Sequence, residues 1–186
     1  MAALSFPNPP LADDVVALRP WRKADIPQRF AGFSDPVCLR FSWPFSEPFT
    51  EAHVRGDLEE HERRRLDGRE INLAVVDVAA RDHVWGGASV YEVDGERSCA
   101  SVGFWLAAHA RGRGIATRTV RLLARWCFDR LELARLQLAC APDNEASRRV
   151  AERCGFTREG VLRAHLPFRG GRRDTVVYGL LPGELR

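Results

Sequence analysis

Residues 101–127 read SVGFWLAAHARGRGIATRTVRLLARWC. The stretch begins as an apolar run, passes through a glycine–arginine corner, and continues with the amphipathic spacing of a helix. One stripe of this helix would carry Val120, Leu123, Ala124 and Cys127. We therefore predict a strand, a tight corner and a helix that begins directly after the corner.

The corner at residues 111–116 is suited to holding a phosphate group. The first N–H groups of a helix have no partner inside it, and Gly112 and Gly114 let a ligand approach the backbone closely. Hydrogen bonds to a charged group contribute about 1.5–3 kcal/mol each, whereas an exposed arginine pair adds about 0–1 kcal/mol. The amides should therefore dominate, with Arg111 and Arg113 steering the ligand in. A plain tight turn and an RG-type nucleic-acid contact are the alternative interpretations.

The composition is that of a globular protein with one domain. The chain has 186 residues, of which 45% are hydrophobic and 28% charged, and its net charge of +3 is too small to indicate nucleic-acid binding. Its five cysteines form no C-x-x-C pair, which argues against a disulfide framework and a zinc site. No apolar run approaches the ~20 residues of a membrane helix, and residues 1–10 do not resemble a signal peptide. We expect a cytoplasmic protein without metal, nucleic-acid or membrane partners.

The order of predicted elements favours one α+β domain at residues 15–183, preceded by a loose, proline-rich segment at residues 1–14. The predicted strands cover residues 15–19, 70–78, 84–93, 99–106 and 135–140. The predicted helices cover residues 25–32, a short piece from Asp35, 51–66 with Thr50 as N-cap, 115–131 and 145–153. Asp94-Gly95 indicates a hairpin inside an antiparallel meander, and Gly170-Gly171 indicates a closing β-hairpin.

Residues 40–49 are dense in aromatics and prolines, and the prolines argue against a regular element there. The aromatic side chains either cap the hydrophobic core or form a wall of a substrate pocket, and these interpretations are compatible. Phe41 and Trp43 are the candidate substrate-binding residues.

Three motifs together resemble the GNAT family of acetyl-CoA-dependent N-acetyltransferases, and within it the RimJ/RimL-like ribosomal-protein N-terminal acetyltransferases. Residues 111–116 resemble the family's R/Q-x-x-G-x-G/A pyrophosphate loop. Residues 144–147, with Gly155-Phe156 at the expected offset, resemble the N-x-x-S segment of that branch. Residues 171–178 resemble the closing strand. The resemblance covers residues 15–181 and implies a GNAT fold: a single mixed central β-sheet flanked by helices, with a C-terminal β-hairpin.

The resemblance also implies a binding site for acetyl-CoA as co-substrate. It assigns to this site Phe104, Trp105, Leu106, Arg111, Gly112, Arg113, Gly114, Ile115, Ala116, Thr117, Asn144 and Ser147. The corner amides would bind the pyrophosphate, and Phe104 and Leu106 would hydrogen-bond the pantetheine arm. An amide near Phe104 or Trp105 would face the thioester carbonyl. Ser147 would protonate the departing thiolate.

Plainer roles are open for some of these residues. Asn144 could simply cap the following helix, and Ser147 could be an ordinary serine of its first turn. A Rossmann site fits poorly, because Thr117 replaces its third glycine and the preceding meander does not suit a βαβ unit. A Walker A lysine is absent.

The general base is the least clearly marked residue. Many GNAT enzymes have a tyrosine acid where this chain has Ala151, and the glutamate that the branch often carries near Ser101 is missing. Glu92 is the candidate base, acting through water, with Asp94 and Glu96 behind it.

The chemistry that these residues predict is direct attack of a primary amine on the acetyl thioester. An α-amine has a pKa of about 7.7–8.0 and a lysine amine about 10.4, so a site without a strong base suits an α-amine better. We expect an N-acetyltransferase, monomeric or homodimeric, that acts on a protein N-terminus or a small-molecule amine. A non-catalytic acyl-CoA-binding module is the alternative.

Overall fold

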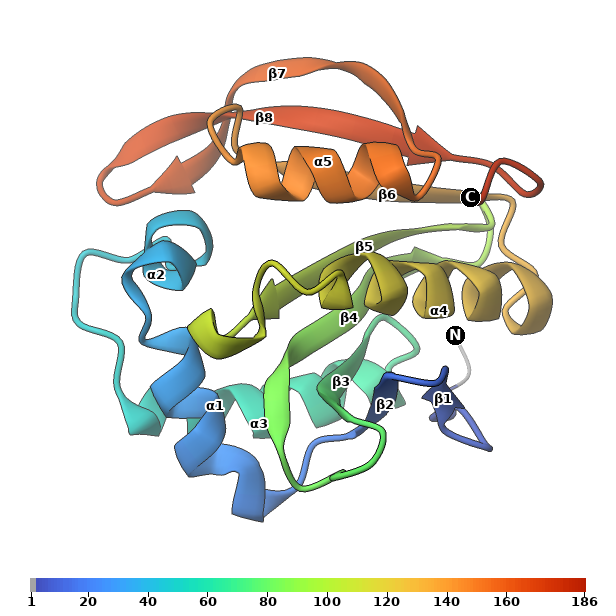
Figure 1. Ribbon diagram of the computed structural model, residues 1–186. Coiled ribbons are helices and arrows are strands. Elements are labelled where there is room, and N and C mark those ends of the chain that lie inside the picture. The colour runs from blue at the N-terminus through green and yellow to red at the C-terminus, as the bar shows by residue number, and fades with distance from the viewer. Residues whose placement is uncertain (1–2) are drawn as a thin grey trace.

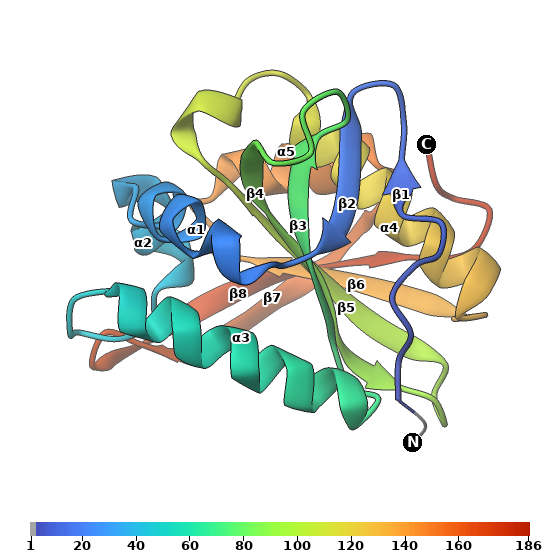
Figure 2. The ribbon, with the colours of Figure 1, turned by 90° about the horizontal axis from the view of Figure 1, so that it is seen from below.

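The computed structural model describes residues 3–186, which form one eight-stranded sheet with helices on both faces (Figures 1 and 2). The strands are β1 (Leu11–Ala12), β2 (Val16–Pro20), β3 (Ile71–Asp77), β4 (Val84–Asp94), β5 (Cys99–Leu106), β6 (Arg135–Cys140), β7 (Thr157–Phe168) and β8 (Gly171–Leu180). The helices are α1 (Ile26–Phe33), α2 (Pro36–Ser42), α3 (Glu51–Leu66), α4 (Ile115–Arg130) and α5 (Glu145–Arg153), with short 3-10 turns η1 (Lys23–Asp25) and η2 (Ala108–Ala110). None of the described helices is both long and apolar enough to span a membrane.

The strand order is β1-β2-β3-β4-β5-β6-β8-β7, and β5 and β6 are the parallel neighbours in an otherwise antiparallel sheet. The predicted α+β class with a mixed sheet and a closing hairpin is confirmed. The β5–β6 pairing lasts for only three residue pairs, from Cys99↔Arg135 to Ser101↔Gln137. Beyond these pairs the two strands separate, as Figure 1 shows.

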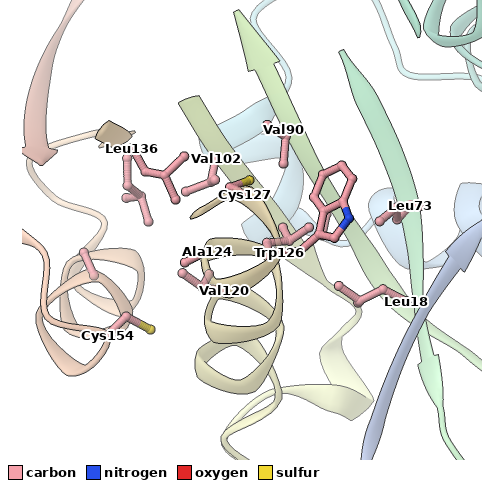
Figure 3. Packing of buried hydrophobic residues seen from close by; sticks show 14 of the residues in the cluster. Leu18, Leu73, Val90, Val102, Val120, Ala124, Trp126, Cys127, Leu136 and Cys154 are labelled. Carbon is pink, nitrogen blue, oxygen red and sulfur yellow. The ribbon is translucent and has the colours of Figure 1, made fainter. Parts of the chain in front are cut away.

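Helix α4 packs across the sheet on the predicted stripe. Val120, Leu123, Ala124 and Cys127 are all 0% exposed. Figure 3 shows this stripe against side chains from both halves of the sheet, among them Leu18, Leu73, Val90, Val102 and Leu136. Burying a valine or leucine side chain stabilises the fold by roughly 1.5–3 kcal/mol. This packing holds the N-terminus of α4 at the end of β5, where the corner lies.

The N-terminal segment differs from the expectation that residues 1–14 are loose. Residues 1–2 lie outside the described part, but Leu11–Ala12 pair with β2, and the Leu4 amide donates to the Arg65 carbonyl at the end of α3. The Arg65 guanidinium lies 4.8 Å from the centre of the Phe6 ring. Residues 3–14 therefore pack on the domain, because their backbone and aromatic groups find partners that a proline-rich composition does not reveal.

Helix α2 extends to Ser42, into the segment whose prolines were expected to exclude regular structure. Asp35 caps the helix, and its Oδ1 accepts hydrogen bonds from the amides of Val37 and Cys38 at 2.9 and 3.4 Å. Pro36 occupies the first turn, where its missing N–H costs nothing. The irregular segment therefore begins only at Trp43, and Phe41 stands on a helix.

Candidate active site

The separation of β5 from β6 opens a cleft that holds two adjoining cavities. The first, here called the corner cavity, has a volume of about 300 Å³ and lies between α2, the residue 111–117 corner and α5. The second, here called the sheet cavity, has a volume of about 330 Å³ and reaches between β4, β5 and β6 toward α1 and α3. Six residues line both cavities: Phe41, Ser42, Phe104, Trp105, Asn144 and Ser147.

The corner carries the expected free backbone donors. Gly112 and Gly114 have φ angles of +74° and +76°, in the left-handed region that favours glycine, and Gly114 is the N-cap of α4. Within residues 3–186, the amides of residues 112–117 donate to no backbone or side-chain acceptor of the protein. Gly112, Gly114, Ile115, Ala116 and Thr117 line the corner cavity. An anion in this cavity would therefore meet an array of N–H groups at a helix N-terminus.

The two corner arginines differ in position, because Arg111 lines the corner cavity but is also paired inside the protein, whereas Arg113 lies away from it. Arg111 Nη2 lies 2.6 Å from Asp35 Oδ1, and its Nε donates to the Leu106 carbonyl at 3.0 Å. The hydrogen bond from Arg111 lowers the pKa of Asp35. Arg111 therefore ties α2 to the end of β5. The Arg113 guanidinium lies 4.9 Å from the centre of the Trp85 ring, and Arg113 lines neither cavity.

The open edge of β5 faces the cleft with alternate backbone groups. The Ala107 amide donates to the Trp85 carbonyl of β4 at 2.8 Å. Because backbone groups alternate between the two edges of a strand, the amides of Phe104 and Leu106 point away from β4, and that of Trp105 points toward it. Phe104 is thus better placed than Trp105 to offer an amide to the cleft.

Asn144 and Ser147 lie on the opposite wall of the cleft. Asn144 caps α5, and its Oδ1 accepts a hydrogen bond from the Ser147 amide at 3.2 Å, so the cap considered from the sequence is present. The cap uses only the carbonyl oxygen of the side chain and leaves the Nδ2 donor for another partner. Both residues line both cavities together with Phe104. The structure therefore brings together the strand, the asparagine and the serine that the sequence singled out.

Phe41 and Trp43, the two residues predicted to bind the substrate, lie in different places. Phe41 lines both cavities and forms part of the cleft wall. Trp43 is 8% exposed, packs against the rings of Phe45 and Phe49 at 4.8 and 4.9 Å, and donates from Nε1 to the Glu47 carbonyl. The structure does not bring Trp43 to the cleft. Trp43 therefore fits the core-capping interpretation, and Phe41 lies where the substrate-pocket interpretation would place it.

Glu92, the candidate base, also lies outside the cleft. It occupies a bulge of β4 with a φ of +53°, and its Oε2 accepts a hydrogen bond from Ser101 Oγ at 2.8 Å. It lines a separate depression with Glu70 and Tyr91, and with the two carboxylates named behind it, Asp94 and Glu96. The geometry therefore gives no support to Glu92 as the proton acceptor. A bulge redirects a side chain, and strand alternation in the sequence does not reveal it.

Several charged residues of the cleft were not found from the sequence. Arg149 and Arg153 of α5 line the corner cavity, and Arg29, Asp57 and Arg173 line the sheet cavity. The four-residue spacing of Arg149 and Arg153 is a signal that could have placed both on one face of α5. No local pattern marks the other three, because they come from α1, α3 and β8.

Residues 16–157 match a family model described as "Acetyltransferase (GNAT) domain". The chain belongs to the GNAT acetyltransferase family. The GNAT fold and the class of enzyme, an N-acetyltransferase that transfers acetyl groups, follow from this membership. Enzymes of the family bind acetyl-CoA.

Individual relatives agree with the family. YdaF of Bacillus subtilis (strain 168), whose name assigns it provisionally to the ribosomal N-acetyltransferases, is 39% identical over 99 residues, which are 53% of this chain and 54% of YdaF. The match thus spans about half of that relative. The ribosomal-protein-serine acetyltransferase of Escherichia coli (strain K12) is 28% identical over 125 residues, 66% of each chain. The structure of Mycobacterium smegmatis RimJ in complex with CoA-disulfide has the same fold, with a TM-score of 0.80, 24% identity, and coverage of 91% of this chain and 83% of RimJ.

Proposed function

We propose that this enzyme transfers the acetyl group of acetyl-CoA directly to a primary amine, either the α-amine of a protein N-terminus or that of a small molecule. The observation that carries the proposal is the single cleft in which free corner amides adjoin Phe104, Asn144 and Ser147. The names of the ribosomal relatives support a protein N-terminus, and such a substrate would place the enzyme in the cytoplasm.

The corner cavity fits the nucleotide part of acetyl-CoA. Its unpaired amides at residues 112–117 suit the pyrophosphate, and Arg149 and Arg153 add positive charge on the other wall. Each charged hydrogen bond contributes roughly 1.5–3 kcal/mol, so the amides outweigh the exposed arginines. The open edge of β5 offers the Phe104 amide to the thioester carbonyl, where negative charge develops during attack.

The proposed step forms a bond from the amine nitrogen to the acetyl carbon, breaks the bond from that carbon to sulfur, and moves a proton from nitrogen to sulfur overall. Ser147 is proposed to donate the proton that the departing thiolate takes up. The leaving thiol has a pKa of about 8.5, so the hydroxyl only needs to assist.

A strong base is not required for an α-amine. Its pKa of about 7.7–8.0 leaves roughly a tenth of the molecules uncharged near neutral pH, against well under one in a thousand for a lysine amine. The absence of Glu92 from the cleft is therefore compatible with an α-amine acceptor. A lysine side chain would need a base, and the one carboxylate that lines either cavity within residues 3–186, Asp57, is paired with Arg29.

Thiol release from acetyl-CoA tests the proposal, with a panel of N-terminal peptides, amino acids and polyamines as acceptors. We expect release with α-amines, and CoA binding by calorimetry. Ser147→Ala should lower kcat by about 100-fold, at the lower end of general-acid effects because the thiol is a good leaving group. The CoA affinity of this variant should stay at the wild-type value. Ser46→Ala, at an exposed serine that lines neither cavity, is the control. The proposal is refuted if no amine in the panel causes thiol release and the protein does not bind CoA.

A further inference from the structure

The sheet cavity contains a buried arginine that the proposed reaction does not use. Arg29 of α1 is only 7% exposed, yet it lines this cavity together with Asp57 and Asn72. The same cavity is lined by Phe104 and Ser147, so its space is continuous with the place where acetyl transfer is proposed. Arg29 therefore lies on the acceptor side of the cleft.

Three groups contact the Arg29 guanidinium: Asp57, the Trp21 ring, and His61, whose Nε2 lies 3.4 Å from Arg29 Nη2. Arg29 Nη2 donates to Asp57 Oδ2 at 3.1 Å, and the central carbon of the guanidinium lies 5.1 Å from the centre of the Trp21 ring. Trp21 is held in turn by a hydrogen bond from its Nε1 to Asn72 Oδ1 at 3.1 Å. Burial lowers the pKa of Arg29, and the Asp57 carboxylate opposes that shift. The donor group is thus preorganised and partly desolvated.

One donor of this guanidinium has no partner. Among residues 3–186, no acceptor contacts Arg29 Nη1, which is buried. A second buried donor without a partner, Arg173 Nε, belongs to another residue of the same cavity. The only carboxylate that lines either cavity within the described residues is Asp57, whose Oδ2 already accepts from Arg29. Buried donors are nearly always satisfied, and the partner open to these two is an oxygen in the cavity, supplied by water or by a ligand.

We propose that Arg29 binds a carbonyl or carboxylate oxygen of the acceptor, so that the preferred substrates are α-amino acyl compounds in which this oxygen lies close to the reacting amine. The inference rests on the proposed acetyl transfer. A cavity of about 330 Å³ has room for an acyl group beside the reacting amine. A peptide carbonyl and a free carboxylate both supply the oxygen, whereas a polyamine supplies none.

Three acceptors with one side chain test the inference: phenylalaninamide, phenylalanine and phenethylamine. We expect wild-type kcat/KM to be highest for one of the first two, and which of them it is identifies a peptide carbonyl or a carboxylate. The variant Arg29→Met with Asp57→Asn removes the donor without leaving a buried charge. It should reduce the preference for the oxygen-bearing acceptor over phenethylamine by about 10- to 150-fold, mainly through KM, which is the loss of one charged hydrogen bond. The three acceptors differ in amine pKa, but this difference affects the wild type and the variant equally. It therefore cancels when their kcat/KM ratios for two acceptors are compared.

The control is Arg22→Met with Asp82→Asn, which removes an exposed ion pair outside the cleft. It should leave the acceptor preference and CoA affinity unchanged. If the Arg29 double variant does not fold, Arg29→Lys, which keeps the charge but loses the planar fork, should reduce the same ratio. Equal use of all three acceptors by the wild type, or an unchanged ratio in a folded Arg29 variant, overturns the inference while the acetyltransferase assignment stands. Absence of thiol release with every acceptor, together with absence of CoA binding, instead refutes the proposed function.

Discussion

Replacing Gly114 with alanine separates the backbone geometry of the corner from the stability of the fold. Gly114 has a φ of +76° as the N-cap of α4, and a Cβ added there would meet no atom within 4 Å. The cost is therefore conformational and not steric. An L-residue in the left-handed region costs about 1–2 kcal/mol. Gly114→Ala should lower the free energy of unfolding by about that amount, or shift the corner backbone to relieve it.

The effect on ligand binding should exceed the effect on stability. If the strain turns one amide of residues 112–117 away from the pyrophosphate, one charged hydrogen bond of about 1.5–3 kcal/mol is lost. This loss corresponds to a rise of about 10- to 150-fold in the Kd for CoA. The thermodynamic assays are calorimetric titration with CoA and urea denaturation without ligand.

Gly170→Ala provides a matched control. Gly170 has a φ of +77° and equally open space, but it lies in the turn between β7 and β8 and lines neither cavity. Both variants should lose similar stability, and only Gly114→Ala should lose CoA affinity. Wild-type CoA affinity in Gly114→Ala, or an equal loss in Gly170→Ala, would show that the corner amides do not hold the pyrophosphate.

Three further predictions follow from the ionisable groups. Because Arg111 lowers the pKa of Asp35 below its ordinary 3.8, their pair stabilises the fold above that pH and loses its effect as the pH falls through the lower folded value. The difference in unfolding free energy between wild type and Asp35→Asn should thus shrink below about pH 4; a constant difference would contradict this. Glu92→Gln should leave the pH profile of kcat/KM unchanged, and loss of its acidic limb would restore Glu92 as the base. Burial raises the pKa of Cys127 to about 12, so iodoacetamide at pH 8 should alkylate the half-exposed Cys99 far faster than Cys127. Peptide mass spectrometry measures both rates, and equal rates would contradict the burial of Cys127.

Local signals explain why much of the fold was predictable. Strands β5 and β6 and helix α5 have the predicted bounds, because turn residues and caps mark their ends. Asp94-Gly95 precedes β5, Asn144 caps α5, and Gly155 follows it with a φ of +95°. The order of strands in the sheet depends on contacts between distant segments. The short β5–β6 pairing, which creates the cleft, therefore has no counterpart in any single stretch of sequence.

The same distinction applies to the site. The corner amides were predictable because glycines and a helix start are adjacent in sequence. The internal role of Arg111 was not, because Asp35 lies 76 positions away and meets it only when α2 packs on the end of β5. The contact of Arg29 with Asp57 likewise requires α1 and α3 to lie side by side. A charged residue in the sequence indicates that an ion-pair partner is needed, but the identity of that partner depends on which segments the fold brings together.

The three-pair contact between β5 and β6 has a consequence for handling this protein. Each strand keeps a row of hydrogen-bonding groups with no neighbouring strand, and such rows tend to recruit other chains. An extended molecule with amides along its length would fill the gap and join the two halves of the sheet. A ligand that binds only the native state increases the protein's free energy of unfolding as the ligand concentration rises. The increase is about 2.7 kcal/mol when the ligand is at one hundred times its Kd. The melting temperature should therefore follow the supply of co-substrate, and preparations saturated with CoA should aggregate least.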